Sequence, residues 1–277
     1  MKGDDIMMAK EYINGVEFVI GKSKKFDRDF AKAERIFKKK ELTATDRMEL
    51  LSIYNVSFHD DGKIEGAASV DSSCHGCKFC QKMREDAEKD PTLICGYCYD
   101  EAQENRWYNT RNRHGLNLLI MSAVDYTEDE LSRLSVSEIT RVNSSGETPN
   151  DIFARNNIRL ANTKKWAHFG YWAKNRGPVK QACEDLGKPA NMKLIQSSIH
   201  IGKADKKDDF FDYVFTVYSD EETTLAAIKG GASPCNGKKC IDCGWKCYYG
   251  THKGDQIAEV LRVSEKKRAA IVKNERR

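Results

Sequence analysis

"WAHFGYWAKNRGPVKQACEDLGKPANMKLIQSSI", residues 166–199, carries the alternation that decides the fold. The apolar runs at 166–173 and 192–199 are typical of buried strands. The polar stretch between them predicts a helix over 177–187, because Gly-Pro opens it and Gly187 follows its last turn. A strand, a helix and a second strand in this order indicate a crossover unit of a parallel sheet.

The same alternation extends in both directions along the chain. Apolar extended runs predict further strands, and capped polar stretches predict helices between several of them. The expected strands are 51–58, 116–123, 138–145 and 212–219, and the expected helices are 151–163 with a cap at Asp151, 219–231 with a capping box from Ser219 to Glu222, and 254–274. About six such units indicate an α/β fold, a partial or full parallel (β/α) barrel whose site lies at the carboxyl ends of the strands.

Three parts are expected along the 277 residues. Residues 1–50 form a basic N-terminal extension, 51–230 form the barrel body with a first group of cysteines, and 231–277 carry a second group and a basic terminal helix. The net charge of +4 is too small an excess to indicate nucleic-acid binding by itself. The basic tail is either a solvated helix or an arm that contacts phosphates.

The cellular compartment follows from two absent signals. The chain starts without the apolar segment of a signal peptide, and it contains no run of eighteen apolar residues. We therefore expect a cytoplasmic protein that does not enter the membrane. Thiols stay reduced there, so clustered cysteines indicate metal ligands rather than disulfides.

Nine of the ten cysteines lie in three short segments: "CHGCKFC" at 74–80, "CGYC" at 95–98 and "CNGKKCIDCGWKC" at 235–247. The last segment has the C-x4-C-x2-C spacing of a ferredoxin-type run and predicts one metal centre. Its ligands would be Cys235, Cys240, Cys243 and Cys247. The first two segments offer five candidates, one more than a four-ligand site needs: Cys74, Cys77, Cys80, Cys95 and Cys98. Either one is a bystander, or the centre uses three and leaves one iron open to substrate.

Iron and zinc both bind thiolates in such spacings. Paired CxxC units are also typical of zinc ribbons, and zinc stays the alternative. The segments flank a long α/β body, however, and the first follows an apolar run, "IYNVSF", just before a helical stretch. This position at the carboxyl end of a strand favours redox chemistry and one or two 4Fe–4S clusters.

Several segments together resemble the phage-encoded "gene product 88" family of predicted iron–sulfur proteins. The segments that show the resemblance are "YNVSF", the cysteine loop, "CGYCYDEAQENRWYNTRNRHGLNLLI" at 95–120 and "RVNSSGE" at 141–147. A closing cysteine group recurs as well. The resemblance spans roughly residues 54–250 and implies a phage protein that acts in the host cytoplasm.

That family is similar, at a distance, to radical S-adenosylmethionine (SAM) enzymes. The resemblance implies a partial barrel, a 4Fe–4S cluster on three cysteines after the first strand, and a segment that binds the methionine part of SAM. Residues implied to bind SAM are Arg141, Asn143, Ser145, Gly146 and Glu147. The chain departs from the family pattern, because its triplet is CxxCxxC and a further CxxC follows. A cluster held by four cysteines would be closed to SAM and would serve structure or electron transfer. The plainer interpretation of 141–147 is a strand followed by a turn.

Two functions remain open from the sequence. The first is a radical-SAM-like or redox enzyme with one catalytic and one auxiliary 4Fe–4S cluster, an electron donor and a small-molecule or nucleic-acid substrate. The second is a non-enzymatic protein, stapled by iron–sulfur or zinc centres, that binds nucleic acid or protein. The chain contains no P-loop, no nucleophile elbow and no HExxH.

Overall fold

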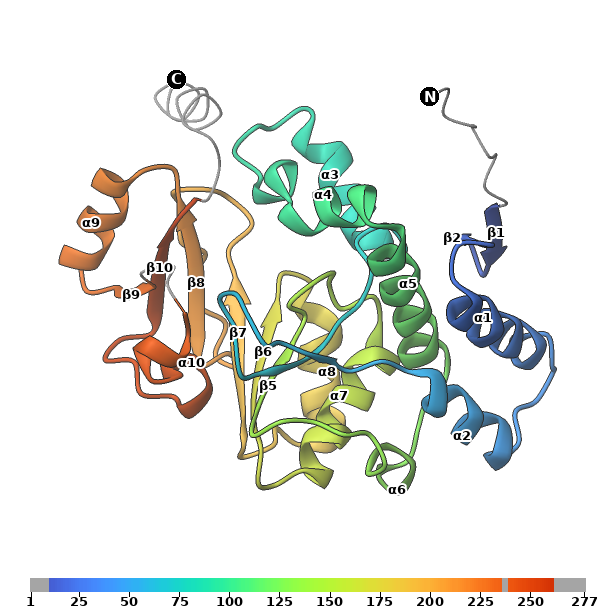
Figure 1. Ribbon diagram of the computed structural model, residues 1–277. Coiled ribbons are helices and arrows are strands. Elements are labelled where there is room, and N and C mark those ends of the chain that lie inside the picture. Colours follow the sequence, from blue (N-terminus) through green and yellow to red (C-terminus); the bar gives the residue numbers. More distant parts are fainter. Residues whose placement is uncertain (1–9, 236–238, 262–277) are drawn as a thin grey trace.

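The computed structural model describes residues 10–235 and 239–261. Its centre is a mixed sheet of eight strands in the order β3-β4-β5-β6-β7-β8-β10-β9 (Figure 1). All neighbours run parallel except β3, which is antiparallel to β4 at one edge. The α/β prediction is confirmed. The pairing of the described residues leaves β3 and β9 as two separate edges, so the full barrel, one of the two forms that were expected, is not observed.

The sheet strands are β3 (Ser57–Phe58), β4 (Ala68–Val70), β5 (Ile139–Val142), β6 (His168–Ala173), β7 (Met192–Ser197), β8 (Tyr213–Tyr218), β9 (Ser233–Cys235) and β10 (Gln256–Val260). A hairpin of β1 (Lys10–Ile13) and β2 (Val16–Val19) stands apart from them. The helices are α1 (Lys24–Phe37), α2 (Ala44–Ile53), α3 (Lys78–Ala87), α4 (Tyr99–Arg106), α5 (Tyr108–Ala123), α6 (Glu128–Leu131), α7 (Asp151–Thr163), α8 (Arg176–Leu186), α9 (Glu221–Lys229) and α10 (Lys246–Tyr249). Two short 3-10 turns, η1 (Ile94–Tyr97) and η2 (Ile241–Cys243), lie in the cysteine segments.

The crossover unit predicted at 166–199 is confirmed as β6, α8 and β7. Gly187 ends α8 with φ of 78°, a conformation that residues with a Cβ rarely adopt. Phe169 pairs with Met192, which sets the register of the two strands. Residues 169–173 are all buried, as expected for a parallel strand that is covered on both faces.

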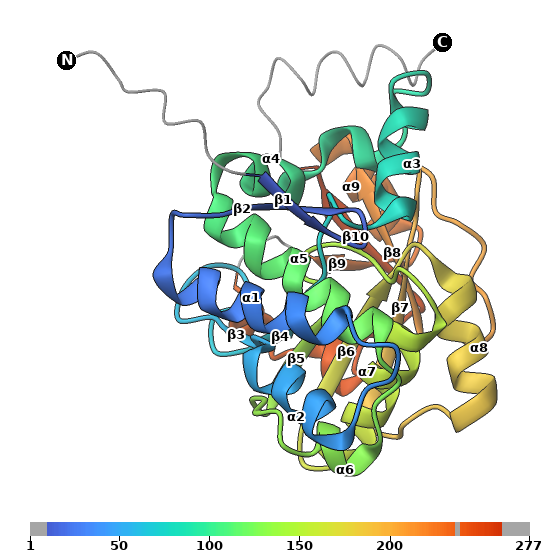
Figure 2. The ribbon, with the colours of Figure 1, turned by 90° about the vertical axis from the view of Figure 1, so that its right-hand side faces the viewer.

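Alternate residues of the strands divide between two cores. One face packs against α5, α7 and α8 through Val142, Phe169, Tyr171 and Leu194. The opposite face packs against α10 through Trp172, Ile195, Tyr213 and Ile257. The N-terminal hairpin and first two helices join the first core, where Phe18, Phe30, Ile36 and Leu50 are buried. Helix α1 lies beside α5 (Figure 2).

Three sequence expectations about single elements are wrong. Residues 116–123 form the last turns of α5 instead of a strand, because this helix is buried almost all round and its apolar run shows no helical period. Residues 51–53 end α2, so only Ser57–Phe58 of the run 51–58 is a strand. Gln256–Val260 is the strand β10 instead of a helix, and the remainder of the expected terminal helix lies outside the described residues.

Two cap positions are also shifted by one residue. Asn150 caps α7 and Asp220 caps α9, in place of Asp151 and Ser219. Both side chains accept a hydrogen bond from the backbone N–H three residues on, as helix N-caps do.

Candidate metal centre

The first cysteine group follows β4, a strand that the sequence analysis missed, and lies against the loop that follows β5. The backbone N–H of Ser72 donates to the carbonyl of Ser145 at 3.1 Å, and the Ser72 hydroxyl donates to the carbonyl of Glu147 at 2.7 Å. Gly146 has φ of 75°, and a Cβ there would lie 2.4 Å from the Ser72 carbonyl oxygen. Glycine at this position therefore lets the two loops touch.

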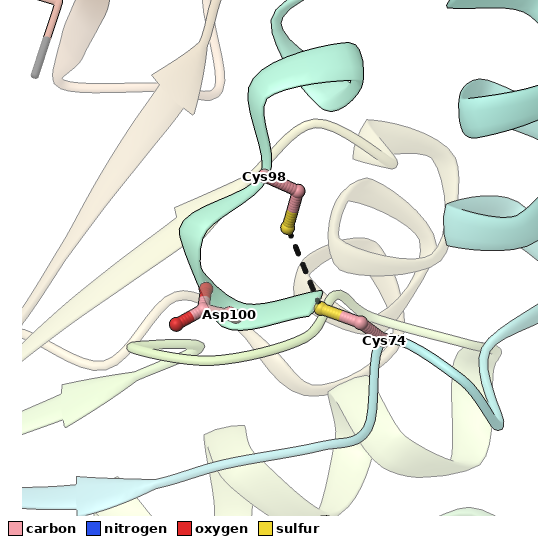
Figure 3. Close-up of side chains that lie close together, drawn as sticks. All are labelled: Cys74, Cys98 and Asp100. Carbon is pink, nitrogen blue, oxygen red and sulfur yellow. Dashed lines mark hydrogen bonds between the residues drawn. The ribbon is translucent and has the colours of Figure 1, made fainter. Parts of the chain in front are cut away.

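The structure brings all five cysteines of the first group together. The Sγ atoms of Cys74 and Cys98 are 3.8 Å apart, and a carboxylate oxygen of Asp100 lies within 4.8 Å of both (Figure 3). The Cys80 thiol is hydrogen-bonded to Cys74 and Cys77. All five are free thiols. Within the described residues, Cys74, Cys98 and Asp100 are the one set of three side chains whose potential ligand atoms lie within 4.8 Å of one another.

Four of the five thiols surround one hollow of about 350 Å³: Cys74, Cys80, Cys95 and Cys98. Cys77 does not line it and is 0% exposed behind Cys80. Soft sulfur donors that converge on one small space, without disulfide bonds among them, fit the donor set of an iron–sulfur cluster or of a zinc ion.

Hydrogen bonds between the thiols separate their pKa values. The Cys80 and Cys98 thiols donate to Cys74 and lower its pKa to about 6, whereas the pKa values of Cys80 and Cys98 rise. Burial raises the pKa of Cys95. Burial, together with the neighbouring Cys98 side chain, also raises the pKa of Asp100 to about 7. A metal would replace these thiol protons, since thiolate is the form that coordinates.

Lys174 supplies positive charge to the same hollow. It directly follows β6 and lines this hollow together with the thiols. Desolvation opposes its charge, but the thiolate of Cys95 and the carboxylate of Glu147 outweigh that effect and raise its pKa. A thiolate-held cluster is anionic, so an ammonium beside it would balance part of that charge.

A buried carboxylate holds the cysteine loop in shape. Glu104 of α4 is 1% exposed and accepts hydrogen bonds from the Ser73 hydroxyl at 2.9 Å and from the backbone N–H of Cys74 and His75 at 3.2 Å. It also contacts His114 Nδ1 of α5 at 3.0 Å. The loop is therefore fixed by two helices that are themselves part of the long crossover between β4 and β5.

A second, larger hollow of about 530 Å³ adjoins the first. The two share a wall made of Asp100, Gly146, Glu147 and Lys174. The larger hollow is further lined by Arg141, Asn143, Trp172, Ser197, Ser198 and Phe215. All of them except Phe215, which lies in the middle of β8, are in or directly after the carboxyl halves of β5, β6 and β7, the edge of the sheet where parallel folds carry their sites.

Of the five residues that the resemblance implied for SAM, the structure brings four to this hollow. Arg141, Asn143, Gly146 and Glu147 line it. Ser145 does not: its hydroxyl contacts His114 Nδ1 at 3.2 Å and its N–H donates to Asp71. The buried Glu147 carboxylate accepts the backbone N–H of Thr148 and of Lys174, each at 2.8 Å, so it also fixes the chain around it.

The second cysteine group begins at the sheet edge formed by β9, whereas the first group begins near the other edge, after β4. Cys240, Cys243 and Cys247 lie in the turn from η2 to α10, Cys235 ends β9, and residues 236–238 between them are outside the described part. Burial raises the pKa of Cys240 to about 11 and that of Cys247 to about 12, and the four thiols act electrostatically on one another. Tight backbone at Gly244 and Trp245, with φ of 68° and 54°, shapes the turn.

Helix α10 places this group near the amino end of β6. Tyr249 stacks edge-on against His168 with ring centroids 4.6 Å apart, and Tyr248 packs on Trp172 at 5.5 Å. Trp172 also walls the larger hollow. The two cysteine groups therefore flank one face of the sheet, with the larger hollow between them.

Sequence reasoning missed several residues of the site. His252, whose Nε2 lies 3.2 Å from Cys247 Sγ, is a further ligand candidate of the second group. Its place five residues after that cysteine was a usable signal. Lys174 could have been found as the residue directly after a predicted strand. Glu104 and His114 gave no such signal, because only the fold brings them to the cysteine loop.

Comparison with known proteins identified no relative: no family model, no curated protein and no solved structure matches the chain. Among the described residues, no helix is both long enough and apolar enough to span a membrane.

Proposed function

We propose that the chain is an iron–sulfur redox enzyme. Its catalytic 4Fe–4S cluster would be held by the first cysteine group, and an auxiliary cluster by Cys235, Cys240, Cys243 and Cys247. One observation carries the proposal: four thiols surround a hollow that shares a wall with a larger hollow of about 530 Å³. A cluster in the first would be separated from a molecule in the second by a single layer of side chains.

The arrangement of the sheet supports this assignment. Strands β4 to β8 and then β10 follow one another in chain order, and α5, α7 and α8 pack on one face. This is how a partial barrel of the radical-SAM type would be built, with both hollows at the carboxyl ends of its strands.

The number of available thiols favours electron transfer over SAM cleavage. Four thiols at one hollow can ligate a cluster completely, and a closed cluster exchanges electrons with a neighbour instead of binding SAM. If only three bind, SAM would lie against Gly146 and Glu147 on the shared wall and would supply a radical when reduced. In both cases Lys174 holds positive charge beside the sulfur atoms, Glu104 positions their loop, and a separate protein or small molecule must donate the electron.

Anaerobic purification followed by iron, sulfide and zinc analysis tests the proposal. We expect brown protein with iron and sulfide in amounts that match two clusters. Cys98→Ser should lose most of the iron of one cluster, because Cys98 lies at the centre of the first group. Cys183→Ser is the matched control, since this buried cysteine lies in α8 away from both groups, and it should retain all iron.

The alternative function is a protein stapled by zinc that binds another macromolecule. The 3.8 Å between the Sγ atoms of Cys74 and Cys98 favours it, because this is roughly the separation of two thiolates on one tetrahedral ion at about 2.3 Å. Colourless protein with stoichiometric zinc would overturn the iron assignment. Formation of 5′-deoxyadenosine from SAM by the reduced protein would instead show that one iron is open.

A further inference from the structure

Asp100 places a carboxylate among the thiols of the first cysteine group. One of its oxygens and the Sγ atoms of Cys74 and Cys98 all lie within 4.8 Å of one another. The three side chains come from two segments, the loop after β4 and the start of α4 (Figure 3). Tyr99 is 70% exposed, whereas Cys98 and Asp100 on either side of it both line the smaller hollow. The start of α4 therefore presents a sulfur and an oxygen donor to the same space.

The Asp100 carboxylate has no direct partner among the described residues. It accepts no hydrogen bond from them and forms no ion pair with them, and Arg141 and His114 act on it only from beyond ion-pair distance. Its oxygens are not sealed inside the protein, because the residue lines both hollows. Carboxylates that are withdrawn from water are normally paired with a cation or coordinate a metal. An uncommitted carboxylate beside two thiols therefore points to a metal.

Glu147, the other carboxylate of the wall shared by the two hollows, is committed to the chain itself. It accepts the backbone N–H groups of Thr148 and Lys174, so donors within the protein already meet its oxygens. The two remaining residues of this wall are Gly146, which has no side chain, and Lys174, which carries an ammonium. Of the four residues described in the shared wall, Asp100 is therefore the one with an oxygen donor to spare.

We propose that Asp100 is a ligand of the metal centre in the first cysteine group and closes the side of that centre that faces the larger hollow. Zinc and iron both accept carboxylate oxygen as well as cysteine sulfur. With Asp100 in a set of four ligands three thiols suffice, so two of the five cysteines are not needed. The inference rests on the proposed function and names a ligand of its first centre.

Three variants of the full chain, purified without oxygen, test the inference. Asp100→Asn keeps the shape of the side chain and removes its negative charge, whereas Asp100→Cys changes the shape and keeps a strong ligand. Asp129→Asn is the matched control. Asp129 is the second residue of α6, as Asp100 is of α4, but it is exposed and far from the thiols in sequence.

The two variants at position 100 should differ in metal binding. We expect Asp100→Asn to hold the metal of the first group at least about 10- to 100-fold more weakly than the control in competition with a chelator, because even the loss of an outer partner of a ligand costs that much. Asp100→Cys should retain the metal. Its X-ray absorption spectrum should show sulfur at about 2.3 Å in place of oxygen at about 2.0 Å. A role in packing or hydrogen bonding predicts the opposite order, with asparagine tolerated and cysteine not.

Equal metal retention by Asp100→Asn and the control would overturn the inference. Any variant that is folded by circular dichroism and loses this metal, Cys98→Ser included, gives an independent measurement. Its X-ray absorption, subtracted from that of the unaltered chain, leaves the ligands of the first centre. Oxygen beside sulfur in that difference would support the inference, and sulfur alone would overturn it.

Iron, sulfide and zinc analysis of the unaltered chain keeps this test apart from that of the proposed function. Zinc held with an oxygen ligand that Asp100→Cys replaces would overturn the redox assignment and leave the ligand assignment intact. Iron and sulfide held by sulfur alone would overturn the ligand assignment and leave the redox assignment intact.

Discussion

Glu104 is the single residue on which the geometry of the first cysteine group depends most. A carboxylate that is nearly removed from solvent is costly unless its oxygens are hydrogen-bonded, and here three donors of residues 73–75 and His114 meet them. The same contacts determine where the backbone of Cys74 lies. Glu104 therefore affects both the stability of the fold and the position of Cys74, a candidate metal ligand.

The variant Glu104→Gln should lower the free energy of unfolding by about 1–3 kcal/mol, because an amide turns N–H groups toward the backbone donors of the loop. It should also lower the iron content, since the loop is no longer held. Urea unfolding and iron analysis measure the two effects. Glu85→Gln, on the exposed side of α3, is the control. Unchanged stability and full iron content in Glu104→Gln would refute this role.

Strand β6 and helix α10 fit together because one strand position has no side chain. A Cβ at Gly170 would lie 2.5 Å from the Trp172 ring and 2.9 Å from the Tyr248 ring. Close packing leaves such atoms no room, and the rings must move if the position is filled. The contact between the second cysteine group and the larger hollow thus depends on this glycine.

We expect Gly170→Ala to cost about 1–3 kcal/mol in the free energy of unfolding, as overpacking of a core does. Because Tyr248 is one of the two rings in the way, Tyr248→Ala should relieve part of that cost when the two changes are combined. Chemical denaturation of the two single variants and the double variant gives the coupling. If the free-energy changes of the two single variants were strictly additive, a side chain at position 170 would not be in contact with the Tyr248 ring.

Helices α2 and α6 are joined by a bidentate ion pair. Arg47 donates to the two carboxylate oxygens of Glu130 at 2.7 and 2.6 Å, and this bond lowers the pKa of Glu130 from 4.5 to about 2. The folded state therefore binds this proton more weakly than the unfolded state does. The stabilisation is present above pH 4.5 and is lost as the pH falls toward 2.

Arg47→Met should remove about 1.5–3 kcal/mol of the stability measured above pH 4.5 and flatten its decline toward pH 2. Urea unfolding at several pH values measures both effects. Lys38→Met breaks an exposed pair with Glu34 and should leave the pH profile nearly unchanged. If Arg47→Met declined as steeply as the unaltered chain, Glu130 would not be the group that titrates.

At the scale of the whole molecule, what could be predicted from the sequence was the part that local chemistry dictates. The unit at 166–199 was predicted because its two apolar runs flank a helix that is bounded by a Gly-Pro start and a glycine stop. The helix at 116–123 was not predicted, because burial on almost all sides removes its helical period. The strand at 256–260 was not predicted, because Ile257, Val260 and Leu261 have the spacing of one helix face. The clustering of five cysteines followed from spacing alone.

Two partners of those cysteines could not be predicted. Glu104 and His114 reach the cysteine loop from α4 and α5, and no local pattern marks them, whereas Lys174 directly follows a predicted strand. Arg141 and Asn143 were identified only through the resemblance and the alternation of β5. Each has a buried side-chain atom without a hydrogen-bond partner, which became visible once the surrounding strands were in place.

Strand β9, among the described residues, has one neighbour in the sheet, and that neighbour is β10. Cys235 is therefore synthesised before β10, the strand with which β9 pairs. In contrast, β4, β5 and β6 are synthesised in the order in which they pair. During translation the first group of thiols can be enclosed while the second is still open to solvent. If both groups hold inorganic centres, as proposed, their insertion would proceed in two separate events, the later one after β10 has been synthesised.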